Sequence, residues 1–597
     1  MSFRRQLSIL AVFLFTLHLA PPIARASDAW VERSNANSAL LMEVFARFSP
    51  EAAGQFGIDG LDEEVSQLPL DLNEKSITMI ESALAEFQTR RETEEHAAVR
   101  QDLDILIEAA EQAIEGTRIS EAYELPYFNL PQTIFQGIRS LLDDQIPQAR
   151  REAALVRLRR YAGLEEGYSP IAEQAEAFVR ASLGRAELVG PFKDDLAKDR
   201  SNGARFIGGI QQLFDKYELT GYEEAYEALT GQLAAYDTFL EAEIAPRARE
   251  DFRLPADVYA FNLKGVGIDM PVAELVSRAK VSFREIQNEM QALSALIASE
   301  RGLESSDYRD VIAELKKEQF VGEAILPHYQ ERIKQLERLI QQHGVVTLPD
   351  REMRIRLASE AESAATPAPN MRPPRLFGNT GEMGEFVLPL RIPGEAGEEE
   401  VGFDDFTYEA ASWTLTVHEG RPGHELQFAS IVEMGVSQAR VAFAFNSVNV
   451  EGWALYQEAE MKPFMPLEGQ LISLQHRLLR AARAFLDPGL QLGAIDREEA
   501  FRVLEHEVVL SHPMAMQEVE RYTFRSPGQA TAYFCGYTRL TELRADTERL
   551  LGDAFDKQAY HDFILAQGLL PPELLRQAVM QNFVGPKVAM QKETSRG

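Results

Sequence analysis

The segment from Thr416 to Gln427 holds the residues best suited to chemistry. It reads Thr-Val-His-Glu-Gly-Arg-Pro-Gly-His-Glu-Leu-Gln. A zinc-binding helix usually carries two histidines four residues apart, with a glutamate beside the first that activates water. Here His418 and His424 are six residues apart, so on a straight helix of about 100° per residue they would point away from each other. A shared metal ion therefore requires an interruption of the helix.

The dipeptide between the two histidines supplies such an interruption. Pro422 cannot donate a hydrogen bond to the carbonyl of His418, and Gly423 tolerates unusual backbone angles. We therefore predict a kink or a widened turn that brings His424 beside His418. The competing second ligand, Glu425, would return to the same helix face about 10 Å along the axis, which is too far to share one ion.

A third ligand is needed, because a catalytic zinc usually has three protein ligands and one open position. The segment Asn449 to Glu458 reads Asn-Val-Glu-Gly-Trp-Ala-Leu-Tyr-Gln-Glu and places Glu451 at the start of a helix, 27 residues after His424. We predict Glu451 as the third ligand. Glu458 lies about two helical turns further along and is expected to support a ligand from behind.

Together these motifs resemble a known family. The patterns His-Glu-x-x-Pro-Gly-His-x-x-Gln and Glu-Gly-Trp-Ala-Leu-Tyr are similar to those of bacterial gluzincin-like proteins described as a domain of unknown function, within the metallopeptidase superfamily. The resemblance continues in residues 480–489, 518–522, 527–536 and 560–562. It implies a zinc hydrolase, most simply a peptidase that attacks an amide bond with an activated water.

The resemblance also implies a role for particular residues. The ligands of Zn²⁺ would be His418, His424 and Glu451, and Glu419 would activate the water. A tetrahedral oxyanion needs a further hydrogen-bond donor. The candidates for this donor are Tyr533 and Tyr522, with Arg521 close by in the sequence.

Two positions depart from the family pattern. Family members usually carry a histidine where this chain has Glu425, and commonly another where it has Gln491. The predicted ligands survive both changes, but the orientation of the substrate and the efficiency of transition-state stabilisation are left open. Three functions therefore stay in view: a peptidase of undetermined cleavage mode, a zinc-dependent esterase or cell-wall amidase, and a non-catalytic periplasmic binding protein that retains a structural metal.

Most of the chain shows the three- and four-residue apolar spacing that is typical of amphipathic helices, as in Asp102 to Glu115. The same spacing predicts helices over residues 152–161, 222–243, 272–298 and 308–342. Residues 385–392 read as a strand containing a proline, which favours an edge position or the lip of a cleft. We expect a predominantly all-α fold, with two helical subdomains around a deep cleft and a small β element before the metal-binding helix.

Changes in composition divide the chain into four parts. Residues 1–26 read as a signal peptide and residues 27–362 as a helical N-terminal region. Residues 363–405 form a Pro-rich connection, the strand and an acidic surface loop, Gly394 to Asp405. Residues 406–597 form a helical catalytic region that contains the metal ligands.

The first residues carry an export signal. Arg4 and Arg5 precede an apolar run of about thirteen residues, which is short of the roughly 20 that span a bilayer. Ala24-Arg25-Ala26 then offers a cleavage site after Ala26. No cysteine lies near this site, which argues against lipid attachment. We predict a periplasmic or secreted protein without stable membrane insertion.

Charge and cysteine content limit the possible partners. The chain has 93 acidic and 61 basic residues, and a surface this negative repels phosphate backbones, so a nucleic-acid partner is disfavoured. The single cysteine, Cys535, excludes an intramolecular disulfide. The expected partner is a peptide or another amide substrate, and nothing in the sequence indicates an oligomeric state.

Overall fold

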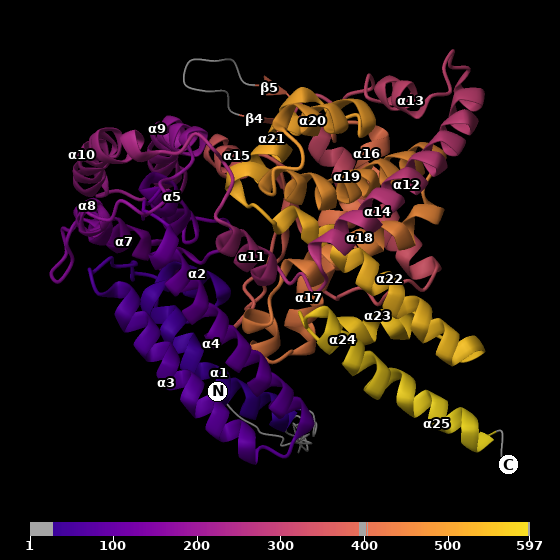
Figure 1. Ribbon diagram of the computed structural model, residues 1–597, viewed down its shortest axis with the longest axis horizontal. Coiled ribbons are helices and arrows are strands. Elements are labelled where there is room, and N and C mark those ends of the chain that lie inside the picture. The colour runs from indigo at the N-terminus through magenta and orange to yellow at the C-terminus, as the bar shows by residue number, and fades with distance from the viewer. Residues whose placement is uncertain (1–27, 393–400, 403, 595–597) are drawn as a thin grey trace, which may run out of the picture.

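The computed structural model describes residues 28–392, 401–402 and 404–594. Helices dominate it, and the predominantly all-α prediction is confirmed (Figure 1). The predicted signal peptide and most of the acidic loop between Gly394 and Asp405 lie outside the described residues.

The first part of the chain builds a helical body from amphipathic helices. In α4, for example, Leu103, Leu106 and Ala110 are buried while Asp104 and Glu108 face solvent, as the spacing predicted. The helices of this part are α1 (Asp28–Phe48), α2 (Pro50–Phe56), α3 (Leu72–Thr93), α4 (Ala97–Tyr123), α5 (Leu130–Arg139), α6 (Gln148–Arg151), α7 (Ala153–Tyr161), α8 (Ile171–Ser182), α9 (Lys193–Lys216) and α10 (Glu223–Phe239).

The last part of the chain builds a second helical body that carries the predicted ligands (Figure 1). Its helices are α16 (Glu409–Leu415), α17 (His424–Met434), α18 (Ser447–Met461), α19 (Leu467–Gln491), α20 (Arg497–Arg502), α21 (His512–Glu520), α22 (Ala532–Leu551), α23 (Lys557–Leu565), α24 (Pro572–Ala578) and α25 (Gly585–Thr594). Its core includes Trp453 and Tyr560, both fully buried.

The middle helices are α11 (Ala256–Gly265), α12 (Val272–Arg301), α13 (Tyr308–Leu315), α14 (Ile325–Gln342) and α15 (Glu360–Ala365). Helices α12, α13 and α14 pack on this second body, α11 contacts both bodies, and α15 packs on α9 of the first body. One hydrophobic core combines Phe283 and Met290 of α12 with Leu471 and Leu478 of α19. The helical regions before and after the Pro-rich connection are thus joined by a common core.

The single helix predicted over residues 308–342 is two helices in the structure. The span 308–342 is interrupted between α13 and α14, where Gly322 has a positive φ of 60°. The Phe320 amide there donates to the carbonyl of Thr407, 2.6 Å away. The prediction of a continuous helix was wrong because this long-range backbone pairing competes with the helical hydrogen bonds.

A small sheet precedes the ligand helices. It contains β1 (Arg354–Leu357), β2 (Asn370–Arg372) and β3 (Glu385–Leu388) in the order β1-β3-β2, with β3 parallel to β1 and antiparallel to β2. The predicted edge position of residues 385–392 is therefore wrong for β3, which is central. The strand ends at Leu388, so Pro389 lies outside the ladder, and a separate pair follows, β4 (Arg391–Ile392) and β5 (Val401–Gly402).

Buried ion pairs attach the sheet to the first helical body. Arg139 of α5, Arg356 of β1 and Arg372 of β2 all contact the Glu362 carboxylate, at 2.5, 2.9 and 3.1 Å. Burial alone would raise the pKa of Glu362, but these arginines hold it well below the usual range. Glu362 therefore stays ionised and fixes the Pro-rich segment that follows it.

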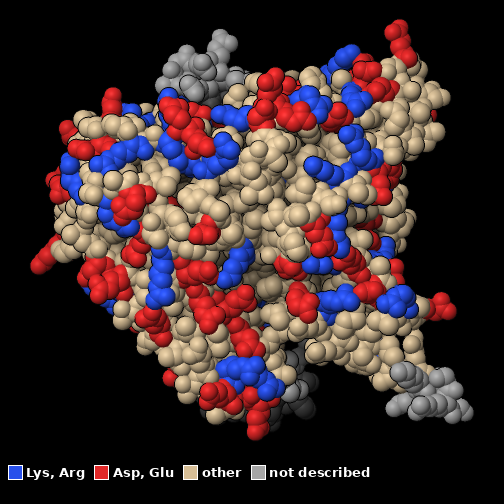
Figure 2. Space-filling model, viewed as in Figure 1, with Lys and Arg blue, Asp and Glu red and all other residues tan. Residues whose placement is uncertain are grey.

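The surface carries many charges of both signs. Figure 2 shows acidic and basic side chains interspersed over this face, in a chain with a formal net charge of −32. No helix in the described part of the chain combines the length and apolar character needed to cross a bilayer.

Helices α18 and α22 meet at backbone contact. A Cβ atom on Gly536 would lie 2.0 Å from the Val448 carbonyl oxygen and 2.6 Å from the Cα of Gly452. Only glycine at both positions permits this approach. The contact sets the relative position of Glu451 on α18 and Tyr533 on α22.

We predict that Gly536→Ala destabilises the protein by about 3 kcal/mol, because the added methyl group overpacks this contact. Denaturant unfolding of chelator-treated protein measures the effect. The matched control is Gly231→Ala on α10, where a Cβ meets nothing within 4 Å and the loss of a helical glycine should stabilise slightly. Equal stabilities for the two variants would contradict the proposed constraint.

Candidate metal centre

The helix that carries the first histidine is interrupted before the second. After α16 the chain makes a π-helical turn, η4 (Thr416–Gly420), and α17 starts anew at His424. The Gly423 amide donates to the carbonyl of Val417, 2.9 Å away. A Cβ on Gly423 would lie 2.1 Å from the His418 carbonyl oxygen, so this close approach requires glycine. The predicted widened turn is confirmed.

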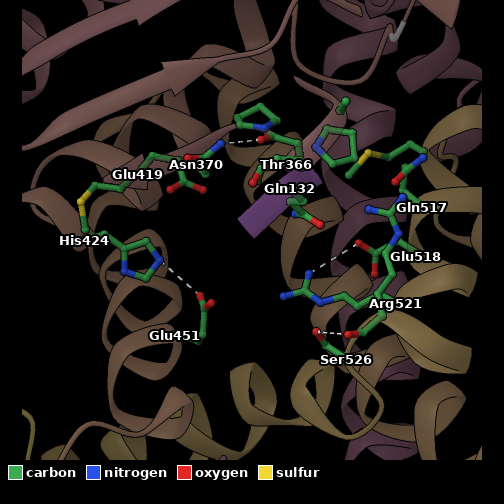
Figure 3. Close-up of a pocket in the computed structure, with 18 of the residues that line it drawn as sticks. Gln132, Thr366, Asn370, Glu419, His424, Glu451, Gln517, Glu518, Arg521 and Ser526 are labelled. Atoms are coloured by element: carbon green, nitrogen blue, oxygen red, sulfur yellow. Dashed lines mark hydrogen bonds and ion pairs between the residues drawn. The ribbon is translucent and has the colours of Figure 1, made fainter. Parts of the chain in front are cut away.

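The interruption brings both imidazoles to one carboxylate. The distance from Glu451 Oε2 to Nε2 is 3.5 Å for His418 and 3.2 Å for His424. The two rings are nearly perpendicular, with centroids 4.7 Å apart. One potential ligand atom from each of the three residues lies within 4.8 Å of the other two. Figure 3 shows His424 and Glu451 facing each other across one side of the cavity.

The geometry of this triad fits a tetrahedral zinc ion. Two ligand atoms that are each about 2.0–2.1 Å from a tetrahedral ion lie about 3.3 Å apart. The two separations from Glu451 bracket this value. Glu451 Oε2 is buried, yet it accepts no hydrogen bond of good geometry from the described residues. Such orphaned buried atoms are rare in proteins unless an ion or water satisfies them.

A second carboxylate supports His418 from behind. Glu458 Oε1 lies 2.7 Å from Nδ1 of His418, and its other oxygen accepts a hydrogen bond of 2.5 Å from the Thr414 hydroxyl. A carboxylate behind a histidine ligand fixes the ring and leaves Nε2 free to bind metal. Sequence reasoning anticipated Glu458 but missed Thr414, although its position four residues before His418 is a recognisable helical spacing.

The electrostatics of the triad favour a cation. Burial lowers the pKa of His418, but the carboxylates of Glu451 and Glu458 outweigh it and raise the pKa to about 9. Burial would likewise raise the pKa of Glu451, but contacts with His418 and His424 hold it well below the usual range. A proton on His418 thus supplies positive charge that a divalent ion could replace.

Trp453 anchors the interrupted helix to the next ligand helix. Its indole N–H donates to the carbonyl of Pro422 at 3.0 Å, and its ring is buried. Trp453 lies two residues after Glu451 on α18. The loop between the histidines and the helix of the third ligand are therefore held together directly.

The triad lines a cavity of about 780 Å³ between the two helical bodies. The Glu419 side chain borders the same cavity, is 8% exposed, and has no hydrogen-bond partner among the described residues. Burial raises the pKa of Glu419, and the nearby histidines oppose this effect. Figure 3 shows Glu419 beside His424, with Gln517 and Arg521 across the cavity.

Tyr533 is the predicted oxyanion donor that reaches this cavity. Its ring stacks on His418 with centroids 6.1 Å apart, and its hydroxyl oxygen accepts a hydrogen bond of 2.9 Å from Arg521. Burial raises the pKa of Tyr533, and Arg521 opposes the shift without reversing it. The phenol therefore stays protonated at neutral pH and has a proton to donate.

Tyr522 is not brought to the metal ligands. It is fully buried and is not among the residues that line the cavity, although its hydroxyl donates at 2.6 Å to Glu518, which does line it. Arg483 holds the same carboxylate through two contacts of 2.8 and 2.5 Å. The geometry therefore separates two tyrosines that the sequence left as equal candidates.

The two departures from the family pattern point away from the triad. Glu425 is fully buried and accepts a hydrogen bond of 2.7 Å from Arg421. The Gln491 amide donates to the backbone carbonyls of Tyr522 and Thr523. Both side chains thus brace the segments that flank the cavity.

We predict that the protein binds one zinc ion and that Glu458→Gln weakens this binding about 10- to 100-fold, because the amide supports His418 poorly. Competition with a chromogenic chelator measures the affinity. Glu460→Gln, on the same helix but paired with Arg544 and Lys557, is the control and should bind zinc normally. A wild-type protein that binds no zinc would rule out the metal centre.

Comparisons with known proteins place the chain in a family. Two solved structures share its fold: a putative lipoprotein from Colwellia psychrerythraea (TM-score 0.73, 17% identity, covering 92% of this chain and 98% of that one) and a putative lipoprotein of unknown function from Shewanella oneidensis (TM-score 0.67, 18%, 92% and 99%). No curated protein matches. Residues 50–579 match a family model, and the chain therefore belongs to the bacterial proteins of unknown function termed DUF885.

Proposed function

We propose that this protein is a zinc-dependent hydrolase of the gluzincin type that cleaves amide bonds in peptides. The observation that carries the proposal is the convergence of His418, His424 and Glu451 at one point of a cavity. The buried carboxylate of Glu419, which has no hydrogen-bond partner in the part of the chain that the structure describes, borders the same cavity. Imidazole and carboxylate ligands, with one position left open, are the donor set of catalytic zinc.

The zinc ion would be held by the triad, with Glu458 fixing the ring of His418. A bound zinc lowers the pKa of a coordinated water towards ~7 and thus supplies a nucleophile at neutral pH. The proposal also draws on the resemblance of the two motifs to those of metallopeptidases.

Glu419 acts as the base and then as the acid. Its carboxylate accepts a proton from the attacking water and transfers it to the leaving amine. Burial raises the pKa of Glu419. A carboxyl group with a raised pKa can both accept a proton from water and donate it to the leaving amine near neutral pH. The absence of a hydrogen-bond partner among the described residues leaves the carboxylate free for this task.

Tyr533 and Arg521 stabilise the negative charge that develops on the carbonyl oxygen. Arg521 donates to the phenol oxygen of Tyr533, which makes the phenol proton a stronger donor. A donor that is already positioned in a site with little water needs no reorganisation during the reaction.

The cavity suits short or unstructured chains. Its walls come from both helical bodies, and Pro367, Pro369 and Pro373 of the Pro-rich connection form part of the lining. A folded protein would not enter such a space. We place the activity outside the cytoplasm. The export signal that the sequence predicts supports this location, and so do the similar solved structures, which are described as putative lipoproteins.

We predict that Glu419→Gln retains zinc but loses at least about 10²-fold in kcat on peptides, because proton transfer is removed. A peptide library digested with and without chelator, and again after zinc is restored, identifies a substrate for this measurement. Glu433→Gln, a surface change on α17, is the control and should leave turnover unchanged. Full turnover by the Glu419 variant would exclude this residue as the base.

We further predict that Tyr533→Phe lowers kcat about 10²-fold with little effect on zinc content, because it removes an oxyanion donor. Tyr522→Phe makes the same chemical change outside the cavity and should leave kcat nearly unaffected. Steady-state kinetics on the library substrate compare the two. The reverse order of effects would assign the donor to Tyr522.

A further inference from the structure

The cavity has a second chemically distinct wall. Asp195 and Asp199 lie four residues apart on α9, so their side chains share one helix face, and both line the cavity. This wall comes from the first helical body, whereas the metal triad belongs to the second. A ligand in the cavity therefore meets carboxylates on α9 as well as the triad.

Neither aspartate has a cation bound to it. No hydrogen bond or ion pair joins the carboxylate of Asp195 or Asp199 to another residue in the described part of the chain. Two cations close to these aspartates, Lys198 of α9 and Arg525 of the second body, are engaged with Glu520. Lys198 Nζ contacts the Glu520 oxygens at 2.7 and 2.6 Å, and Arg525 contacts the same carboxylate at 3.0 Å.

A third cation near Asp195, the guanidinium of Arg249, also has hydrogen-bond partners of its own. Arg249 donates to the backbone carbonyls of Gly190 and Asp251, at 3.2 and 2.6 Å. Among the charged groups of α9 that line the cavity, the two carboxylates are therefore the ones without a hydrogen-bond or ion-pair partner in the described part of the chain. This favours a cationic ligand over an anionic one.

Burial leaves both aspartates poorly solvated. It raises the pKa of Asp195 to about 6 and that of Asp199 to about 7, against the lowering effect of Arg525. A carboxylate that is short of solvent and lacks a partner gains more from an incoming cation than an exposed one does.

A second observation, on the side of the cavity that holds the metal triad, also indicates that a ligand binds. Glu419 is buried to more than nine-tenths, borders the cavity, and has no hydrogen-bond partner among the described residues. Unsatisfied polar groups thus face one space from two directions, which is the arrangement of a binding site and not of a structural void.

We propose that Asp195 and Asp199 bind an ammonium or guanidinium group of the substrate, so that the enzyme prefers short peptides with a positive charge. The charge would come from a lysine or arginine side chain or from a free amino terminus. This inference rests on the proposed function, since it names the substrate class of the same cavity.

The test compares matched peptides that differ by one charge. Library substrates are made with lysine or acetyl-lysine, and separately with a free or acetylated amino terminus, which distinguishes the two sources of charge. The kcat/KM ratio of charged to neutral peptide is measured for the wild type, Asp199→Asn and the double variant with Asp195→Asn. Asp194→Asn is the control, because Asp194 lies on the same helix but pairs with Arg497 and does not line the cavity.

We expect the wild type and the Asp194 variant to favour the charged peptide at least about tenfold, as for a hydrogen bond to a charged group. In the double variant the ratio should fall towards one, with little change for the neutral peptide. A ratio near one in the wild type, or an unchanged ratio in the double variant, would overturn the proposal.

Equilibrium binding separates this proposal from the proposed function. The same peptide pairs are titrated into the Glu419→Gln protein by calorimetry. If no peptide is hydrolysed but the charged one binds more tightly through Asp195 and Asp199, the hydrolase assignment fails and the cation site stands. If peptides are hydrolysed without charge preference, the cation site fails and the hydrolase stands.

Discussion

The metal centre depends on one close backbone approach. Gly423 packs its Cα against the carbonyl of His418, where any side chain would clash, and this closes the widened turn that ends the first ligand helix. His424 then becomes the first residue of a new helix instead of the continuation of the old one. Without this approach the imidazoles would diverge, and neither Glu451 nor Glu419 would have a common point to face.

The parts around this turn are rigid because each is held by a buried polar or backbone contact. Glu458 and Thr414 fix the ring of His418, Trp453 holds the loop at Pro422, and the glycine contact between α18 and α22 fixes the third ligand. These contacts hold the ligand side chains in place before the metal binds. The conformational entropy of ordering the ligands is then lost during folding and does not weaken metal binding.

The cavity joins two bodies with different chemistry. The second body contributes imidazoles, Glu419 and the Tyr533–Arg521 pair, which suit the reaction itself. The first body contributes the carboxylates of α9, which suit recognition. Because the ion pairs on Glu362 attach the first body to the sheet and the Pro-rich wall, the two sets of groups keep a defined relation across the cavity.

Features that depend on local spacing could be predicted from the amino-acid sequence. Helical periodicity predicted the all-α fold, and Pro422-Gly423 predicted the widened turn between His418 and His424. Four other features became visible only in the folded chain: β3 is central, α12 packs on α19, Tyr533 and not Tyr522 reaches the cavity, and Asp199 faces it. Periodicity reports which face of an element is buried, whereas the partner of that face is set by long-range packing that leaves no local signal.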